Sequence, residues 1–150
     1  MPISSLKEKI KIQEAFKALQ RSTADTRYND QTTAASAVGI DTKNFDQAII
    51  ALALGTITSP GTLDVTVLES SVGTTAAGAN AITNAVIAQK SNGDSGLYVG
   101  QIDTKNTKRY LYVKAVAATA SAKAYGISVI LGKSDGLDPV TQVNTVAFTA

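Results

Sequence analysis

The feature that most constrains the fold is a run of alternating side chains from Lys108 to Ala117. From Leu111 onward every second position is apolar, and the alternate positions of the run include two tyrosines and two lysines. A period of two predicts a β-strand with one buried face and one outward face. The buried face would carry Leu111, Val113, Ala115 and Ala117, and the outward face Tyr110, Tyr112 and Lys114.

The two tyrosines of this strand allow two interpretations. A tyrosine joins a large apolar ring to a polar hydroxyl, which suits a surface that becomes buried on assembly. Tyr110 and Tyr112 are therefore predicted to lie at a subunit interface. Alternatively, both rings pack across to neighbouring strands of the same chain, as cross-strand pairs do in sheets.

Other short segments with strand character follow at regular intervals. Residues 46–55 alternate with apolar side chains on both faces, which predicts a central strand. Further predicted strands cover residues 37–41, 62–69, 82–88, 97–102, 122–131 and 143–148, with turn signals at Pro60-Gly61, Asn92-Gly93 and Pro139. Seven or eight short strands without βαβ alternation predict a mainly β fold, an antiparallel, jelly-roll-like β-sandwich.

The N-terminal segment has a different pattern. Ser5 and Glu8 have the spacing of a capping box, which predicts a helix from about Leu6 to Gln20. Its apolar residues fall on two nearly opposite stripes, so one stripe is free to meet a partner. The predicted partner-binding residues are Leu6, Ile10, Ile12, Phe16 and Leu19. A helix packed on its own domain and a disordered tail are the alternatives.

Two regions follow from this reading. Residues 1–36 are predicted to form an arm, a short helix or extended segment followed by a polar linker, and residues 37–150 the β-sandwich domain. A total length of 150 residues agrees with one domain that has its own core.

Composition excludes several kinds of chemistry. The chain contains no Cys and no His, so disulfides, thiolate metal sites and histidine acid–base catalysis are ruled out. A net charge of +2 is too small for a nucleic-acid footprint. No run of 18 apolar residues is present, and the first residues lack the core of a signal peptide. We expect no nucleic-acid or membrane partner and assembly in a reducing cytoplasm.

The acidic residues give no convincing site. Asp41, Asp46, Asp64 and Glu69 are the candidates for a paired-carboxylate mechanism, but they sit near predicted strand ends, where solvated carboxylates are common. The acids in the predicted loops lack the spacing of a calcium loop, and no phosphate-binding loop is present. The sequence therefore predicts no enzyme, no catalytic residue, no cofactor and no metal.

Several stretches taken together resemble small virion proteins of tailed bacteriophages, in particular the head decoration or cement type. The stretches are Ser5–Phe16, Gly39–Ala48, Val65–Ser71, Lys108–Lys114 and Ile130–Gly132. The resemblance covers most of the chain but consists of strand and turn patterns. It implies a structural protein on the outer surface of a phage head, often a homotrimer, that binds and stabilises the major capsid protein. It also implies synthesis in the cytoplasm of a bacterial host.

Two other functions remain open from the sequence. A carbohydrate-binding or adhesin-like sandwich would need an aromatic platform, for which Tyr110 with Tyr112, or Tyr28 with Tyr98, are the candidates. The other is a head–tail connector or tail protein, which would also be a structural protein of the virion but would form a ring. Fold alone does not separate these functions.

Overall fold

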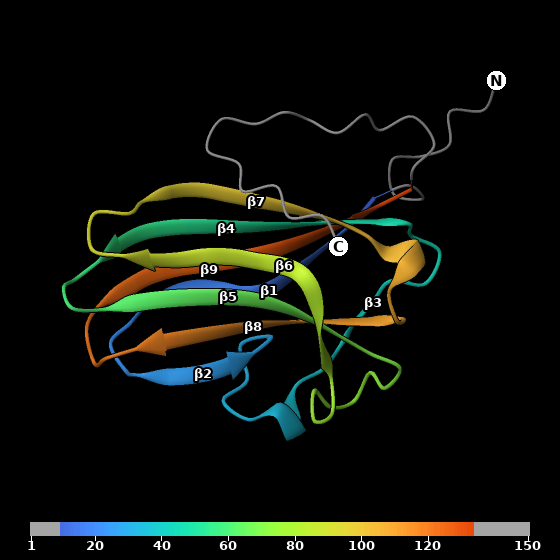
Figure 1. Cartoon of the computed structure of the whole chain (residues 1–150), viewed down its shortest axis with the longest axis horizontal. Helices are drawn as coiled ribbons and strands as arrows, with labels where there is room; N and C mark the ends of the chain where they lie inside the picture. Colours follow the sequence, from blue (N-terminus) through green and yellow to red (C-terminus); the bar gives the residue numbers. More distant parts are fainter. Residues whose placement is uncertain (1–9, 134–150) are drawn as a thin grey trace.

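The fold is a sandwich of two antiparallel sheets (Figure 1). It is seen in a computed structural model that describes residues 10–133. Sheet A has the order β1-β9-β4-β7, and sheet B has the order β2-β8-β5-β6, with β3 also paired to β8. The strands are β1 (Ile10–Arg21), β2 (Asp25–Tyr28), β3 (Ile40–Asp41), β4 (Gln47–Ile57), β5 (Thr62–Ser70), β6 (Asn80–Ser91), β7 (Gly96–Asp103), β8 (Tyr110–Ala118) and β9 (Lys123–Gly132).

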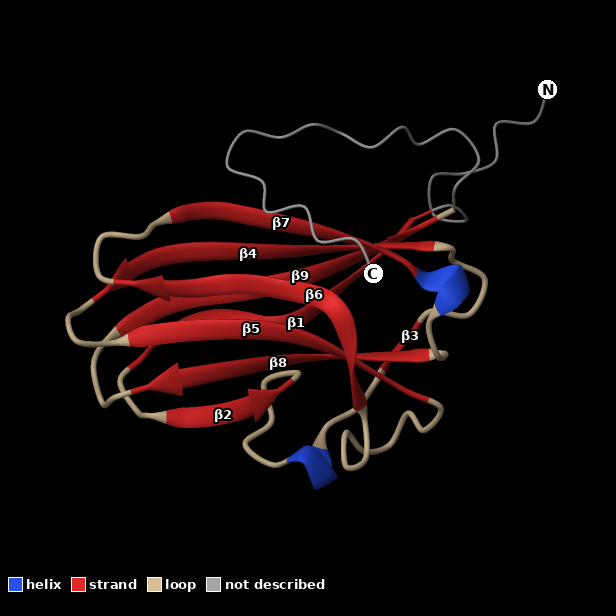
Figure 2. Ribbon diagram, viewed as in Figure 1, coloured by secondary structure: helices blue, strands red, loops and turns tan. Residues whose placement is uncertain are grey.

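The predicted fold class is confirmed. Within residues 10–133 the helical elements are two short 3-10 turns, η1 (Ala34–Ser36) and η2 (Thr104–Asn106), at the periphery of the sheets (Figure 2). No helix in this part of the chain is long and apolar enough to cross a membrane. The predicted last strand, 143–148, lies outside the described residues.

The core forms between the inner faces of the two sheets. Ile50 and Leu52 on β4 and Leu63 on β5 are fully buried, as is Val113 on β8. The alternation in residues 46–55 and 108–117 therefore predicted the inward positions correctly. Complete burial of one such side chain stabilises the fold by roughly 1.5–3 kcal/mol. The strands with the strongest alternation, β4 and β8, both occupy interior positions in their sheets.

The predicted N-terminal helix is wrong in its described part. From Ile10 to Arg21 the chain is a strand, β1, that pairs antiparallel with β9 at the edge of sheet A. The register shifts twice, between Glu14 and Phe16 and again between Phe16 and Leu19. Each bulge adds a residue and interrupts the alternation, so the apolar spacing imitates that of a helix. Pairing along β9 overrides a weak local preference for helix.

The described part of the predicted arm belongs to the sandwich. β1 lies in sheet A and β2 in sheet B, so residues 10–28 connect the two layers at one side (Figure 1). The capping box at Ser5 and Glu8 lies outside the described residues. The first described residue, Ile10, pairs with Gly132, so both described ends lie at the same end of sheet A.

Candidate contact surface

The outer face of sheet A carries a row of three isoleucines, of which one is exposed. Ile12 on β1 is opposite Ile130 on β9, and Ile130 is opposite Ile49 on β4. Directly opposite residues share a face, so the three side chains form one row. Ile12 is 68 % exposed, and the other two are half-buried. We call Ile12, Ile49 and Ile130 the isoleucine patch.

A hollow of about 490 Å³ lies towards the other end of sheet A. Small residues form its floor, and two exposed leucines stand beside it, Leu19 (53 % exposed) and Leu97 (45 % exposed). A Cβ on Gly126 would lie 2.9 Å from the Cα of Ala18, so a side chain at this position of β9 would clash with the backbone of β1.

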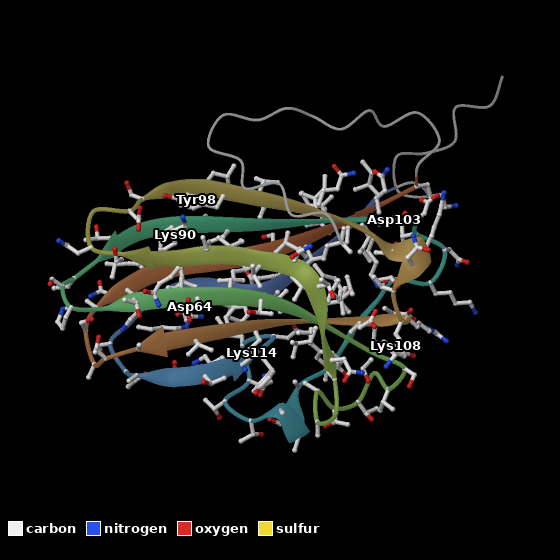
Figure 3. All side chains as sticks on the ribbon, viewed as in Figure 1. Asp64, Lys90, Tyr98, Asp103, Lys108 and Lys114 are labelled. Atoms are coloured by element: carbon white, nitrogen blue, oxygen red, sulfur yellow. The ribbon has the colours of Figure 1, made fainter. Side chains whose placement is uncertain are left out.

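The outer face of sheet B carries charged and polar side chains beside one exposed valine, Val86 on β6 (46 % exposed). Asp64 on β5 accepts a 3.0 Å hydrogen bond from Gln89 on β6. The Lys114 ammonium on β8 lies 5.9 Å from the ring centroid of Tyr28. Figure 3 labels Asp64 and Lys114 on this sheet. Because burying such groups carries a desolvation cost, the apolar face of sheet A is the better contact surface.

The predicted partner-binding residues do not all lie at the surface. Ile12 and Leu19 are exposed, and Ile10 is half-buried, so these three remain available. Phe16 is wrong as a partner contact, because it is 1 % exposed and packs in the core with its ring 5.9 Å from that of Tyr125. Leu6 lies outside the described residues.

Tyr112 lies inside the chain. It is fully buried, and its hydroxyl donates a 2.8 Å hydrogen bond to the carbonyl of Val72. Burial raises the pKa of its phenol. A Cβ on Gly39 would lie 2.9 Å from the Tyr112 ring, so this ring is closely covered. The prediction of Tyr112 as a subunit-interface residue is therefore wrong, and the packing alternative applies.

Tyr110 is half-buried, and its surroundings also belong to its own chain. The Arg109 guanidinium lies 5.1 Å from its ring centroid. A Cβ on Gly73 would meet the same ring at 2.5 Å. Its remaining exposed surface leaves a contact with another subunit untested.

No free aromatic platform is found among the tyrosines, all of which lie in the described part of the chain. Tyr28 and Tyr110 each have a cation near one ring face. Lys90 on β6 places its ammonium 4.2 Å from the ring centroid of Tyr98 on β7, and Figure 3 shows the pair at the same edge. Tyr112 and Tyr125 are buried. Stacking of a sugar on these rings is disfavoured.

Each of the candidate carboxylates has a partner of its own. Asp41 accepts two hydrogen bonds from Arg109, at 2.9 and 2.7 Å, which lower its pKa to about 2. Glu69 accepts from the Lys108 amide at 2.9 Å. Asp46 forms an ion pair with Lys105 at 3.4 Å, and Asp64 pairs with Gln89. In residues 10–133 no group of three metal-ligating side chains occurs.

One buried cluster of hydrogen bonds, centred on Arg21, is not predicted from the sequence. The Arg21 guanidinium donates to the carbonyls of Tyr125 (3.0 Å) and Lys17 (2.9 Å) and to the Asp30 carboxylate (2.9 Å). It is 7 % exposed and joins the end of β1 to β9 and to the turn after β2. Tyr125 is far from Arg21 in the sequence, so no local signal marks the pair. The cluster fixes β1 in place and thereby positions Ile12 and Leu19.

Comparison with known proteins adds little beyond the architecture. No family model and no curated protein matches the chain. One similar solved structure is that of infectious bursal disease virus Gx strain, with TM-score 0.49 and 14 % identity over 87 % of this chain. This chain spans 33 % of that one. A second is from Bacillus endospore appendages that form disulfide-linked pili, with TM-score 0.33, 18 % identity, and coverage of 81 % of this chain and 90 % of that one. At this degree of similarity we draw no functional inference from either protein.

Proposed function

We propose that this chain is a structural protein of a phage particle, of the head decoration or cement type, which acts by binding the outside of the protein shell. The observation that carries the proposal is the isoleucine patch on sheet A. Its partner would be the major capsid protein, and the working form would be a homotrimer on the outer head surface. Neither nucleic acid nor a membrane takes part.

The patch supports binding to a protein surface. Ile12 is the most exposed of its three side chains, and its burial on a partner would contribute roughly 1.5–3 kcal/mol. Glu14 and Ser128 face outward in the next register row, so polar groups border the patch as at protein interfaces. A modest contact suffices in a shell, because symmetry repeats the same contact many times.

The partners of the candidate carboxylates support a role without catalysis. Paired acids work in glycosidases only when both flank one substrate. Here Asp41 is held in a bidentate pair with Arg109, and Asp64 is bound by Gln89 from the neighbouring strand. A carbohydrate-binding role is less well supported, because Tyr98 and Tyr110 each have a cation near one ring face.

The first test is the composition of particles. Particles released by cells that carry the gene are purified on a density gradient and analysed by denaturing gel and mass spectrometry. We expect the chain in a fixed ratio to the major capsid protein. When the particles are washed with increasing concentrations of chaotrope before the gel, this chain should be released at a lower concentration than the shell subunits. Particles without this chain would overturn the proposal.

The second test uses two matched substitutions. Ile12→Asp places a charge in the isoleucine patch, while Val38→Asp places one at a site of equal exposure, 69 % against 68 %, outside sheet A. Binding of each purified variant to shells stripped of the chain is measured by co-sedimentation. Desolvating a carboxylate should weaken binding of Ile12→Asp at least about tenfold and leave Val38→Asp unchanged. Equal binding by both variants would remove sheet A from the mechanism.

A further inference from the structure

β7 is a regular edge strand of sheet A. Among the described strands it pairs with β4 alone and is the last in the order of its sheet (Figure 1). Its pairing with β4 runs from Gly96 to Asp103 without a register shift. The strand contains no proline and no lysine, the residues that commonly protect an edge. Alternate residues of β7 therefore direct backbone N–H and C=O groups away from β4, in a form that another strand can extend.

The other edge strands of the described sheets are less regular. β1 has two register shifts, and both backbone groups of Lys17 are bound by side chains, the N–H by Asp30 (3.4 Å) and the carbonyl by Arg21 (2.9 Å). β2 is 4 residues long. β6 has two register shifts against β5 and contains Asn84 at φ 62°. Bulges and short strands protect an edge from further pairing, so β7 differs from the other three.

We propose that the edge of β7 binds the β7 edge of a second copy of this chain. The two strands pair antiparallel across a two-fold axis normal to the sheet, so that sheet A of both copies becomes one continuous sheet. A second β7 is the best partner, because regular pairing needs two regular edges and the other described edges are interrupted or short. A two-fold contact uses the same residues on both copies.

This inference does not rest on the proposed function. The homotrimer of that proposal needs a three-fold contact, which the two-fold contact at β7 does not supply. If both contacts form, each β7 pair joins two neighbouring trimers. The two contacts are therefore tested separately.

The side chains of β7 favour a register with Val99 on the two-fold axis. Directly opposite residues of a sheet share a face, and a residue on the axis is opposite its own copy. Leu97 then lies opposite Gln101 of the second copy, and Tyr98 opposite Gly100. The tyrosine ring covers the gap that the glycine leaves on the neighbouring strand. Residues 96–102 all pair, which gives about six to eight backbone hydrogen bonds.

Other registers fit less well. An axis at Gly100 places two glycines opposite each other and Leu97 opposite the Asp103 carboxylate. An axis at Tyr98 shortens the paired segment to residues 96–100. The arrangement centred on Val99 keeps the pairing long and leaves Asp103 outside it.

The first test measures the native mass of the full chain by sedimentation equilibrium over a range of concentrations. We expect a dimer, or a hexamer if trimers also form. Val99→Lys places two lysines directly opposite each other and should weaken the dimer at least about tenfold. Gln101→Lys is the matched control, because its lysine lies on the same face of β7 but four positions from its copy. Its effect should stay below about threefold.

A charge exchange tests the register. Val99→Glu alone should also dimerise weakly, since two carboxylates then lie opposite each other. An equimolar mixture of Val99→Lys and Val99→Glu should form a heterodimer at least about tenfold more tightly than either variant forms its own dimer. Native mass spectrometry separates the heterodimer from the two homodimers by mass. Circular dichroism checks that each variant is folded.

Several results would overturn the proposal. A parent chain that stays monomeric at every concentration, or forms only assemblies with an odd number of copies, has no such pair. A dimer that Val99→Lys leaves unchanged has its contact elsewhere. A dimer that Val99→Lys weakens but the mixture does not restore lacks the pairing at Val99. Equal shell binding by Ile12→Asp and Val38→Asp would count against the proposed function and does not bear on these results.

Hydrogen exchange distinguishes a second copy from a cover within the chain. In the dimer, alternate amides between Leu97 and Gln101 should exchange more slowly than in the dilute monomer, while exchange in β8 should be the same in both. Equal protection of the β7 amides in monomer and dimer would mean that the edge is covered within one chain, and would overturn the proposal.

Discussion

The guanidinium of Arg21 lies over the ring of Tyr125, 4.5 Å from its centroid, and donates a 3.0 Å hydrogen bond to the Tyr125 carbonyl. This contact joins the end of β1 to β9. The contact thereby holds β1 in the sandwich, although the sequence predicts that these residues form an arm. Because β1 also carries Ile12, the same contact positions the proposed partner surface.

Arg21→Ala should destabilise the fold by about 2–3 kcal/mol, because it leaves buried carbonyl groups and the Asp30 carboxylate without their main donor. Arg27 retains a 3.6 Å contact with Asp30 and limits the loss. Urea unfolding measures the change. Arg109→Ala is the control, because its ion pair with Asp41 is exposed and screened by solvent, so its removal should cost clearly less than that of Arg21. Equal losses in the two variants would contradict the assigned role of Arg21.

Phe16→Ala should cost about 3–5 kcal/mol, since it removes a large buried ring from the core. Ile12→Ala, four residues away on the same strand, should change stability by less than about 0.5 kcal/mol because Ile12 is exposed. Thermal or urea unfolding of both variants measures the two changes in stability. A helical arm with both residues at a partner surface would instead give small, similar changes in the isolated protein.

The Asp41–Arg109 pair should make a small acid-dependent contribution to stability. Arg109 lowers the pKa of Asp41 to about 2 in the folded chain, from 3.8. A depressed folded pKa means that the stabilisation is complete above the unfolded pKa and is lost as the pH falls from about 4 to about 2. The pair is exposed, so solvent screening keeps its contribution small.

Asp41→Asn tests this dependence. The difference in free energy of unfolding between the parent and the variant should be present at pH 7 and shrink towards zero near about pH 2. Lys43→Gln removes a charge in the same turn but leaves the Asp41–Arg109 pair in place. The difference in free energy of unfolding between this variant and the parent should therefore not shrink as the pH falls. For Asp41→Asn, a difference that stays constant with pH would contradict a contribution from the charge of Asp41.

Sequence alternation predicted the central strands well. Residues 46–55 and 108–117 have their apolar side chains at strict intervals of two, and each run became a strand inside a sheet with those side chains buried. Their register is set by the cost of turning a complete apolar face outward. The isoleucine patch was only partly foreseen: Ile12 was predicted as a contact residue, but Ile49 and Ile130 join it only through pairing across three strands.

The N-terminal segment shows where such reasoning fails. Apolar residues at 12, 15, 16 and 19 have helical spacing, but two bulges in β1 produce the same spacing in a strand. Local preference for helix is worth a few tenths of a kcal/mol per residue, whereas pairing with β9 and burial of Phe16 contribute far more. Pattern alone does not reveal a bulge, because the bulge depends on the partner strand.

The sequence by itself determined the class of fold, the inward faces of the central strands and the lack of histidine and cysteine chemistry. These properties depend on side-chain period and residue type, which are local. Only the tertiary structure decided that residues 10–21 form a strand, that Tyr112 is internal, and that three isoleucines from separate strands form one row. Those outcomes depend on which distant segments pair. The free energy of that pairing depends on both partner strands, so the sequence of one segment does not determine it.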